Sequence, residues 1–319
     1  MKLWKNEIMN SADQTILERL KINCRLSLQD LSKITGISAN AVKKRIDSLK
    51  ASGAIDSFTL LLSPLMTDEN SVIAILKFET DQREKTLLKI LSSNPSVSKV
   101  SRLLDGRYIV FGVYFDSEEL SSLTMHLRKL PGIRNVEMYS RFLHYWGGKI
   151  DLTNSHREIL RCLIEDPRMP ISDIAKETGL PSNAIKEIID QMRESEAVLF
   201  TINMSDDVNE GSMEVLAKVQ WNVGKTSNEH VLGWLQDKFA SSHLGEYVSA
   251  SEPTLFFNFS VKHVHEVDIV SQKTKESGLV TTMEPLILFP GTKFPDPRVR
   301  RVGQLLEETG FSSQNSPFA

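Results

Sequence analysis

Three short stretches with helical spacing of apolar residues open the chain and return 143 positions later. Residues 13–49 align without a gap on 156–192, with 13 identical positions. In the first copy the apolar spacing predicts helices over about 13–22, 27–34 and 38–51. We interpret the two segments as duplicated three-helix units on one scaffold.

Turn and cap residues separate these helices where a helix-turn-helix requires them. Ser27 and Ser38 stand at N-cap positions, and Gly36 can supply the left-handed conformation of a tight turn. Alternation over 53–60 then predicts a strand, suited to a wing or to a hinge leading out of the domain.

From residue 71 the apolar period changes, and the predicted order becomes βαββαβ. The expected elements are a strand 71–79, a helix 82–92, strands 97–104 and 107–116, a helix 117–130 and a strand 133–143. The second copy gives a strand 214–221, a helix 228–240, strands 244–250 and 254–262, a helix 263–277 and a strand 279–289. Each unit predicts a four-stranded antiparallel sheet with both helices on one face, the ferredoxin-like arrangement of an α+β fold.

The expected domains follow from these patterns. They are a winged helix-turn-helix 1–60, a ferredoxin-like domain 61–148, a second helix-turn-helix 149–205, a second ferredoxin-like domain 206–297, and a C-terminal helix and tail 298–319. The proline-rich segment 290–297 is expected to end the fold.

Net charge, the positions of Cys and His, and the length of apolar runs limit the classes of function that the chain can have. The 319 residues carry a net charge of −3, so binding to nucleic acid needs a local basic patch. Cys24 and Cys162 are expected to be buried thiols, and His263 and His265 lack a second ligand cluster. We expect no metal site and no cofactor. No apolar run is long enough to span a membrane, so we expect a soluble cytoplasmic protein.

Local charge distinguishes the two copies. Residues 13–56 hold eight Lys and Arg against five Asp and Glu, whereas 156–199 hold six against nine. On the third helix Lys44 aligns with Glu187 and Arg45 with Ile188, and Gly53 beyond it aligns with Glu196. Only the first copy keeps a cationic outer face.

The segment LSKITGISANAVKKRIDSLKASGAI (31–55) closely resembles the DNA-binding signature of the leucine-responsive Lrp/AsnC family of bacteria and archaea. LLDGRYIVFGVYF and LPGIRNVEMY resemble that family's regulatory domain, so the chain resembles two family units in tandem. The resemblance implies a DNA-binding transcriptional regulator and no enzyme. The residues expected to contact DNA are Ser38, Asn40, Lys43, Lys44, Arg45 and Lys50.

A helix in the major groove needs cations and polar groups outside and an apolar stripe inside. The first copy offers both, because Val42, Ile46 and Leu49 form the stripe. Carboxylates would face phosphates in the second copy, which we therefore predict not to bind DNA. It is expected to expose Ile188 to a partner surface. One basic head per chain implies two chains on one operator, hence a homodimer or higher assembly.

The family resemblance implies that the sheets pair and bind small effectors, typically amino acids, near the loop between the central strands. Here that loop offers Asp105, Gly106, Arg107 and Tyr108, where Asp105 could meet an ammonium group. The alternative is that Asp-Gly only turns a hairpin. The second loop, 250–254, lacks the glycine. We expect the two sheets of one chain to pair with each other.

Two other classes remain open. The same two-domain plan is that of siroheme decarboxylases, and the groups available for such an enzyme are Arg107, His126, Arg141, His144, His263 and His265. A protein-binding module is the third class. The aromatic segment 141–146 could line a ligand site or fill a domain interface, and Arg298, Arg300 and Arg301 could meet a phosphate or a partner carboxylate.

Overall fold

The computed structural model describes residues 11–141, 147–204, 212–240 and 242–307. These residues form two compact units. The head unit comprises residues up to 67, 147–204 and 302–307, and the sheet unit comprises 68–141 and the described residues from 212 to 301. The expected aromatic cluster 142–146 lies outside the described residues, as does the tail beyond 307.

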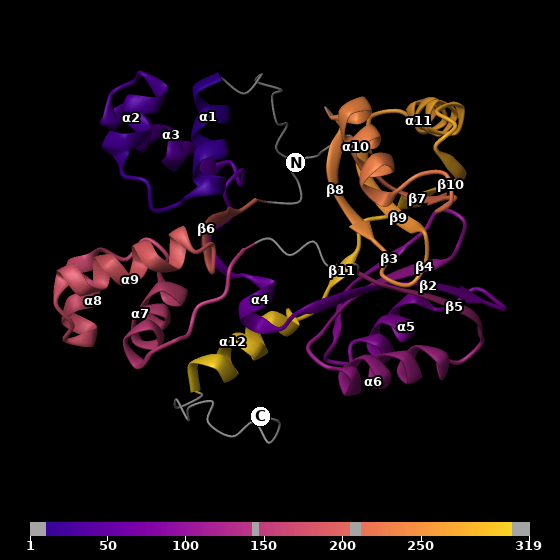
Figure 1. Ribbon diagram of the computed structural model, residues 1–319, viewed down its shortest axis with the longest axis horizontal. Coiled ribbons are helices and arrows are strands. Elements are labelled where there is room, and N and C mark those ends of the chain that lie inside the picture. Colours follow the sequence, from indigo (N-terminus) through magenta and orange to yellow (C-terminus); the bar gives the residue numbers. More distant parts are fainter. Residues whose placement is uncertain (1–10, 142–146, 205–211, 241, 308–319) are drawn as a thin grey trace. The chain divides into compact units, whose positions relative to one another are not determined.

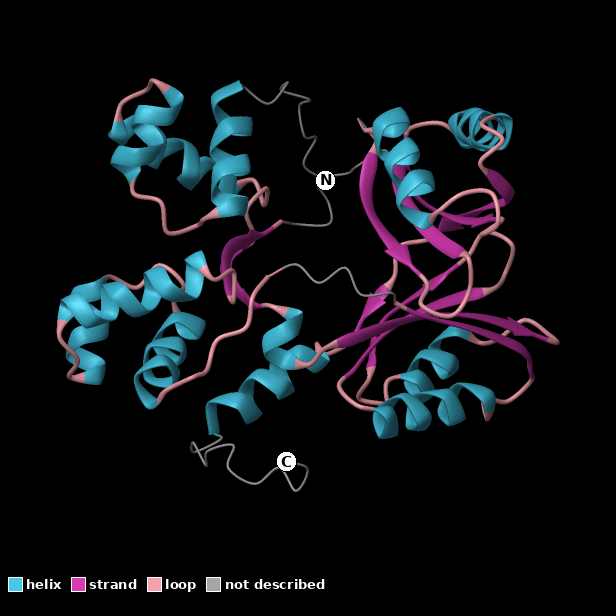
Figure 2. Ribbon diagram, in the orientation of Figure 1, coloured by secondary structure: helices cyan, strands magenta, loops and turns pink. Residues whose placement is uncertain are grey.

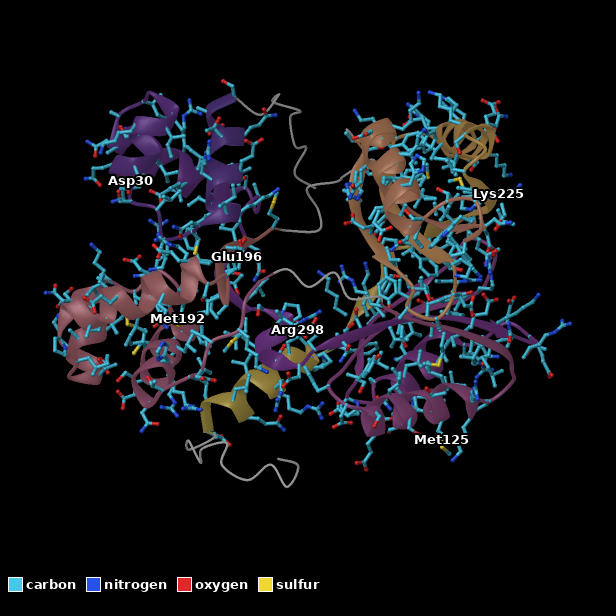
Figure 3. All side chains as sticks on the ribbon, viewed as in Figure 1. Asp30, Met125, Met192, Glu196, Lys225 and Arg298 are labelled. Atoms are coloured by element: carbon cyan, nitrogen blue, oxygen red, sulfur yellow. The ribbon has the colours of Figure 1, made fainter. Side chains whose placement is uncertain are left out.

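The first copy in the head unit is a helix-turn-helix whose turns are built by local hydrogen bonds. Its helices are α1 (Ser11–Ile22), α2 (Leu28–Thr35) and α3 (Ala39–Ala51). Ser27 and Asp30 form a reciprocal capping box at the start of α2. Asp30 is labelled in Figure 3. Gly36 adopts φ +72°, and the Ser38 hydroxyl accepts the Ala41 amide at the start of α3. The predicted caps and turn are therefore confirmed.

The second copy repeats the three helices with different caps. It comprises α7 (Asn154–Glu165), α8 (Ile171–Thr178) and α9 (Ser182–Glu194). Gly179 takes φ +71°, like its counterpart Gly36. Prolines 170 and 181 replace the serine caps, and neither provides a side-chain hydrogen bond. The duplicated scaffold therefore survives the loss of two polar caps.

A strand from each copy joins the two copies. β1 (Ser57–Leu62) pairs antiparallel with β6 (Val198–Asn203), in a register that places Ser57 opposite Asn203. The three helices of each copy lie on either side of this ribbon (Figure 1). The prediction of a wing or hinge in this segment was incomplete, because the exposed backbone of β1 finds its partner in the other copy. A short helix, α4 (Pro64–Thr67), follows.

Equivalent arginines of the two copies donate hydrogen bonds to the opposite copy. Arg25 donates hydrogen bonds to the carbonyls of Pro167 and Met169, at 2.6 and 3.0 Å. Its counterpart 143 positions later, Arg168, donates to the carbonyl of Leu26 at 3.2 Å. Buried apolar residues of both copies belong to one cluster. The head unit is therefore one core with an approximate internal repeat.

The sheet unit contains two βαββαβ domains. The first consists of β2 (Asn70–Phe78), α5 (Glu84–Leu91), β3 (Val97–Arg102), β4 (Tyr108–Tyr114), α6 (Ser117–Arg128) and β5 (Ile133–Ser140). The second consists of β7 (Met213–Trp221), α10 (Asn228–Phe239), β8 (His243–Val248), β9 (Thr254–Val261), α11 (Val264–Glu276) and β10 (Val280–Leu288). The second sheet has the order β10-β7-β9-β8, which is the ferredoxin-like arrangement.

The first sheet has one strand more than predicted. Its order is β11-β3-β4-β2-β5, because β11 (Thr292–Lys293) crosses from the second domain and pairs with β3. The proline-rich segment therefore does not simply end the fold. The chain continues into α12 (Pro297–Glu307), where Arg298 forms a bidentate pair with Glu69 at 2.7 and 2.8 Å. Arg300 pairs with Glu119 at 2.6 Å.

The two sheets pack face to face, as the sequence predicts. Ile73 and Ile75 of β2 share a cluster with Leu216, Phe256 and Leu286 of the second domain. Helices α5 and α6 cover the outer face of the first sheet, and α10 and α11 cover that of the second (Figure 2). β2 is therefore buried on both faces, which explains its nearly unbroken apolar run.

Candidate nucleic-acid interface

Helix α3 has an inner and an outer face. Val42, Ile46 and Leu49 are buried in the head core, so the spacing of four and three residues fixes the rotation of the helix about its axis. At the start of α3, Ser38 and Asn40 are exposed to solvent, whereas Ala39 and Ala41 are half-buried. The N-terminal half of such a helix is the part that reads base edges.

The outer face carries polar and cationic groups close together. Asn40, Lys43 and Lys44 are all exposed. Asn40 can bond an adenine edge in two places, and the lysines can neutralise phosphates. The spacing of three and four residues places these side chains on neighbouring rows of one surface. The structure therefore brings together three of the six residues singled out for DNA contact.

The other predicted contact residues have partners within the head unit. Arg45 forms an ion pair with Asp13 of α1, with Nη1 and Oδ1 2.9 Å apart. The ammonium of Lys50 lies 4.5 Å from the ring centre of Phe58, and the Ser38 hydroxyl accepts the Ala41 amide. Arg45 thus holds α3 against α1, a role that the basic sequence KKR did not reveal.

The equivalent surface of the second copy has the opposite charge. Lys186 and Glu187 are exposed on α9 where Lys43 and Lys44 stand on α3. Asp190 and Glu194 both contact Arg193, at 3.0 and 3.3 Å, so that cation is neutralised locally. Ile188 packs against the head core, which corrects the expectation of an exposed apolar contact at this position.

The loop between β3 and β4 holds a charged cluster that reaches across the sheet pair. Arg107 contacts Asp105 at 2.5 Å and Glu284 of the second domain at 2.6 Å. Partial burial opposes ionisation of Asp105, but hydrogen bonds from Arg107 hold its pKa below the usual range. Glu284 was not recognised in the sequence, because nothing in the local pattern links residues 177 positions apart.

The other loop residues already serve the hairpin. Gly106 adopts φ +87°, and its amide donates to the Leu103 carbonyl at 3.0 Å. The Tyr108 side chain is buried in the core between the first sheet and its helices, and this burial raises its pKa. These contacts are what a hairpin turn requires.

The groups considered for tetrapyrrole chemistry lie on several elements. Arg141 stacks at 5.8 Å over Tyr247, and His126 is on α6. His263 and His265 stack on each other at the start of α11, 5.6 Å apart. His144 is outside the described residues. Across the described part of the chain there is no group of three or more His, Cys, Asp or Glu that could hold a metal ion.

The sequence predicts that both cysteines are buried thiols. Cys24 is buried and Cys162 is half-buried, and both are free thiols. Burial raises the pKa of Cys24 to about 11, so this thiol is protonated near neutral pH. No helix within the described ranges is long and apolar enough to cross a bilayer.

Both heads match known helix-turn-helix domain families. Residues 9–50 match the AsnC-type helix-turn-helix domain, and residues 152–198 match a winged helix-turn-helix DNA-binding domain. An uncharacterised HTH-type transcriptional regulator of Pyrococcus horikoshii is 25% identical over 137 residues, covering 42% of this chain and 88% of that protein. LrpA of Pyrococcus abyssi, an HTH-type transcriptional regulator, is 25% identical over 134 residues, covering 40% and 93%.

Among solved structures, the siroheme decarboxylase NirDL has a similar fold over almost the whole chain. Its TM-score is 0.62 at 14% identity, with 93% of this chain and 98% of that chain covered. At this identity the likeness concerns the fold. The AsnC-type match over residues 9–50 and the similarity to LrpA over part of the chain agree with the resemblance to the Lrp/AsnC family that the sequence shows.

Proposed function

We propose that this protein is a sequence-specific DNA-binding transcriptional regulator in which only the first head reads DNA. The proposal rests on the outer face of α3, where Asn40, Lys43 and Lys44 are exposed above a buried apolar stripe. Each lysine that neutralises a phosphate releases a condensed counterion, which favours binding at low salt.

The second head serves as a structural partner of the first. The β1–β6 ribbon and the paired arginines, Arg25 and Arg168, hold the copies together. If α9 entered the major groove in the way proposed for α3, Glu187 would face the DNA phosphates. Repulsion between its carboxylate and the phosphates disfavours binding. One chain therefore supplies one reading head, and a homodimer would supply the two heads that a two-half-site operator requires.

The DNA-binding experiment uses retention of the full chain on immobilised random-sequence duplex. We expect retention to fall steeply between about 50 and 200 mM salt. The double variant Lys43→Glu, Lys44→Glu should abolish retention and leave Arg45 in place on Asp13. Introducing a cation in the second copy by Glu187→Lys alone should change retention little, and this change leaves Ile188 packed against the head core. Equal losses from charge reversal in both copies would contradict the assignment.

We further propose that an amino acid effector acts at the Asp105–Arg107–Glu284 cluster, beside the Gly106 backbone. The expected contact from Tyr108 is not part of this proposal, because its side chain is buried between the first sheet and its helices. Asp105 is already paired with Arg107, so an incoming ammonium group must displace that guanidinium. Displacement would weaken a contact between the two sheets and so couple the ligand to their pairing. Calorimetric titration with the common amino acids, compared between the wild type and Asp105→Asn, tests this; equal binding to both would reject it.

An enzyme on the same fold is the second candidate, although the whole-chain similarity to NirDL concerns the fold alone. Such an enzyme would need cations around the carboxylates of a tetrapyrrole. Arg107 is engaged by two carboxylates, and the outer face of α3 would have no role in that reaction. Absorbance after incubating the purified chain with a tetrapyrrole separates the classes: a stoichiometric bound pigment would favour the enzyme.

A further inference from the structure

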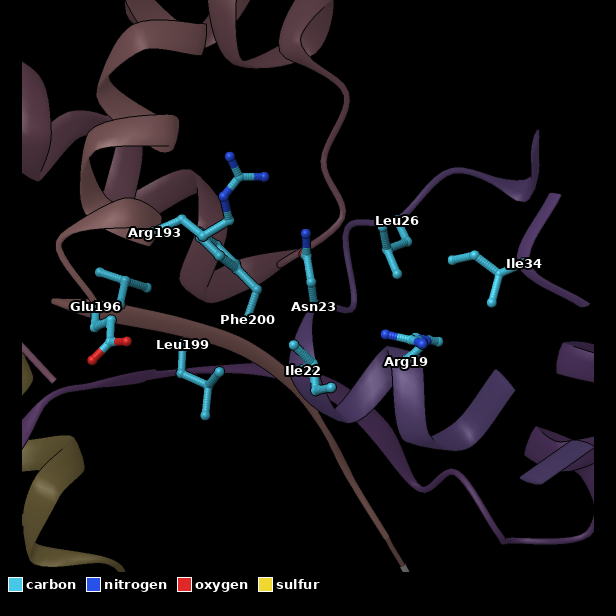
Figure 4. A pocket seen from close by; sticks show the side chains of 10 residues that line it. Arg19, Ile22, Asn23, Leu26, Ile34, Arg193, Glu196, Leu199 and Phe200 are labelled. Carbon is cyan, nitrogen blue, oxygen red and sulfur yellow. The ribbon is translucent and has the colours of Figure 1, made fainter. Parts of the chain in front are cut away.

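A pocket of about 570 Å³ lies inside the head unit, between the two copies (Figure 4). The first copy contributes the end of α1, the connection to α2, and Ile34 of α2. The second copy contributes the end of α9 and the strand β6. The pocket is therefore absent from either copy taken alone.

The pocket wall is mainly apolar and partly open to solvent. Val198 and Phe200 are each 1% exposed and belong to the head core, whereas Ile22 and Ile34 are 65% and 43% exposed. An apolar molecule bound here would remove the two exposed isoleucines from water and contact the buried side chains of Val198 and Phe200. Small-molecule sites commonly combine such a wall with one or two placed polar groups.

The two arginines that line the pocket differ in their ion pairs. Arg193 is neutralised by Asp190 and Glu194. Arg19 has no carboxylate partner among the described residues. Figure 4 shows Arg19 beside Leu26 and Ile34, with Arg193 and Glu196 at the other side. The arginine available to a ligand thus lies next to the exposed apolar wall, and a guanidinium binds a carboxylate with two parallel hydrogen bonds.

The pocket also adjoins the turn that leads to the candidate DNA-reading helix. Ile34 lies in the last turn of α2, two residues before Gly36, after which α3 begins at Ala39. A ligand bridging α2 and β6 would favour one spacing of the two copies. Any difference in affinity between two such arrangements would shift their populations.

We propose that this pocket binds a small apolar carboxylate, with Arg19 holding the carboxylate and Ile22, Leu26 and Ile34 covering the apolar part. A further consequence, which rests on the proposed DNA-binding function, is that the bound ligand changes affinity for duplex DNA. The site is separate from the charged cluster of the sheet unit.

The test is calorimetric titration of the full chain with octanoate, and with octan-1-ol as a probe without charge. We expect octanoate to bind at about 1 mM or tighter, as is ordinary for a ligand of this size. Octan-1-ol, which lacks the carboxylate, should bind about tenfold or more weakly than octanoate. The Arg19→Gln variant should bind octanoate more weakly by a similar factor. Arg193→Gln, a matched change on the same pocket, should leave affinity within about twofold, because its charge is already neutralised.

Equal binding of octanoate and octan-1-ol to the wild type would overturn the proposal without reliance on any variant. So would equal affinity of the Arg19→Gln and wild-type chains. Coupling to DNA is measured separately, as the change in duplex affinity when octanoate is saturating. An unchanged duplex affinity would reject coupling, whereas a chain that binds octanoate and no DNA would reject the proposed function and retain the pocket.

Discussion

The two helix-turn-helix copies share a core and differ in their outer surfaces. Ile46 of α3 and Ile189 of α9, 143 positions apart, are both buried in the same cluster. Lys44 and Glu187, separated by the same interval, are both exposed and opposite in charge. Positions that face the core therefore preserve the fold, whereas positions that face solvent determine whether a phosphate backbone can approach.

The largest expected effect concerns the shared core. Ile46→Ala and Ile189→Ala should each lower the free energy of unfolding of the head unit by about 2–5 kcal/mol, because each leaves a cavity. Hydrogen exchange should show weaker protection of both copies in either variant. If Ile189→Ala left the protection of α1–α3 unchanged, the copies would be independent domains.

The paired arginines are expected to have a smaller effect. Arg25→Ala removes two hydrogen bonds from a charged donor and Arg168→Ala removes one, so the first should cost more, at about 1.5–3 kcal/mol. Urea unfolding followed by amide exchange in the heads would measure both. A larger loss for Arg168→Ala would contradict the order that the contacts predict.

A matched pair of backbone changes should have opposite signs. Gly53 and its counterpart Glu196 both have positive φ, +79° and +56°. Gly53→Ala should destabilise the head unit by about 1 kcal/mol, since space for the Cβ is available and only the left-handed backbone opposes it. Glu196→Gly should instead stabilise it by up to about 1 kcal/mol. Thermal unfolding of both variants tests the signs, and destabilisation by Glu196→Gly would be the contrary result.

The smallest expected effect is on the stability of α2 at acidic pH. Hydrogen bonds from the side chain and backbone of Ser27 lower the pKa of Asp30, so this cap contributes stability above the ordinary pKa of an aspartate, about 4, and loses it as the pH falls through the lower folded value. Asp30→Asn should flatten the acid dependence of amide protection in α2. In the second copy Pro170 offers no cap hydrogen bond, and Asp173 instead pairs with the exposed Lys176 at 2.7 Å, so Asp173→Asn should change the protection of α8 less than Asp30→Asn changes that of α2. Equal responses in α2 and α8 would contradict this comparison.

Local pattern and internal repetition predicted much of the molecule. The three-residue and four-residue spacing of Val42, Ile46 and Leu49 correctly assigned the inner face of α3. Alternation located the βαββαβ strands, and duplication suggested that their sheets pair.

Contacts between segments far apart in the sequence could not be predicted from local patterns. β1 could be recognised as a strand, but its pairing with β6 depends on how two copies meet, which no local spacing records. The two-residue strand β11 is too short to show alternation. The ion pairs of Arg45 with Asp13 and of Arg107 with Glu284 likewise depend on the folded arrangement.

The most direct test of the account compares one lysine in each copy. Lys43 and Lys186 occupy equivalent, exposed positions, and Lys43→Glu and Lys186→Glu change net charge equally. Anisotropy of a labelled duplex at low salt should show that Lys43→Glu weakens binding by about tenfold or more and reduces the salt dependence. Lys186→Glu should leave both nearly unchanged. Equal weakening by the two variants would contradict the claim that the first head alone reads DNA.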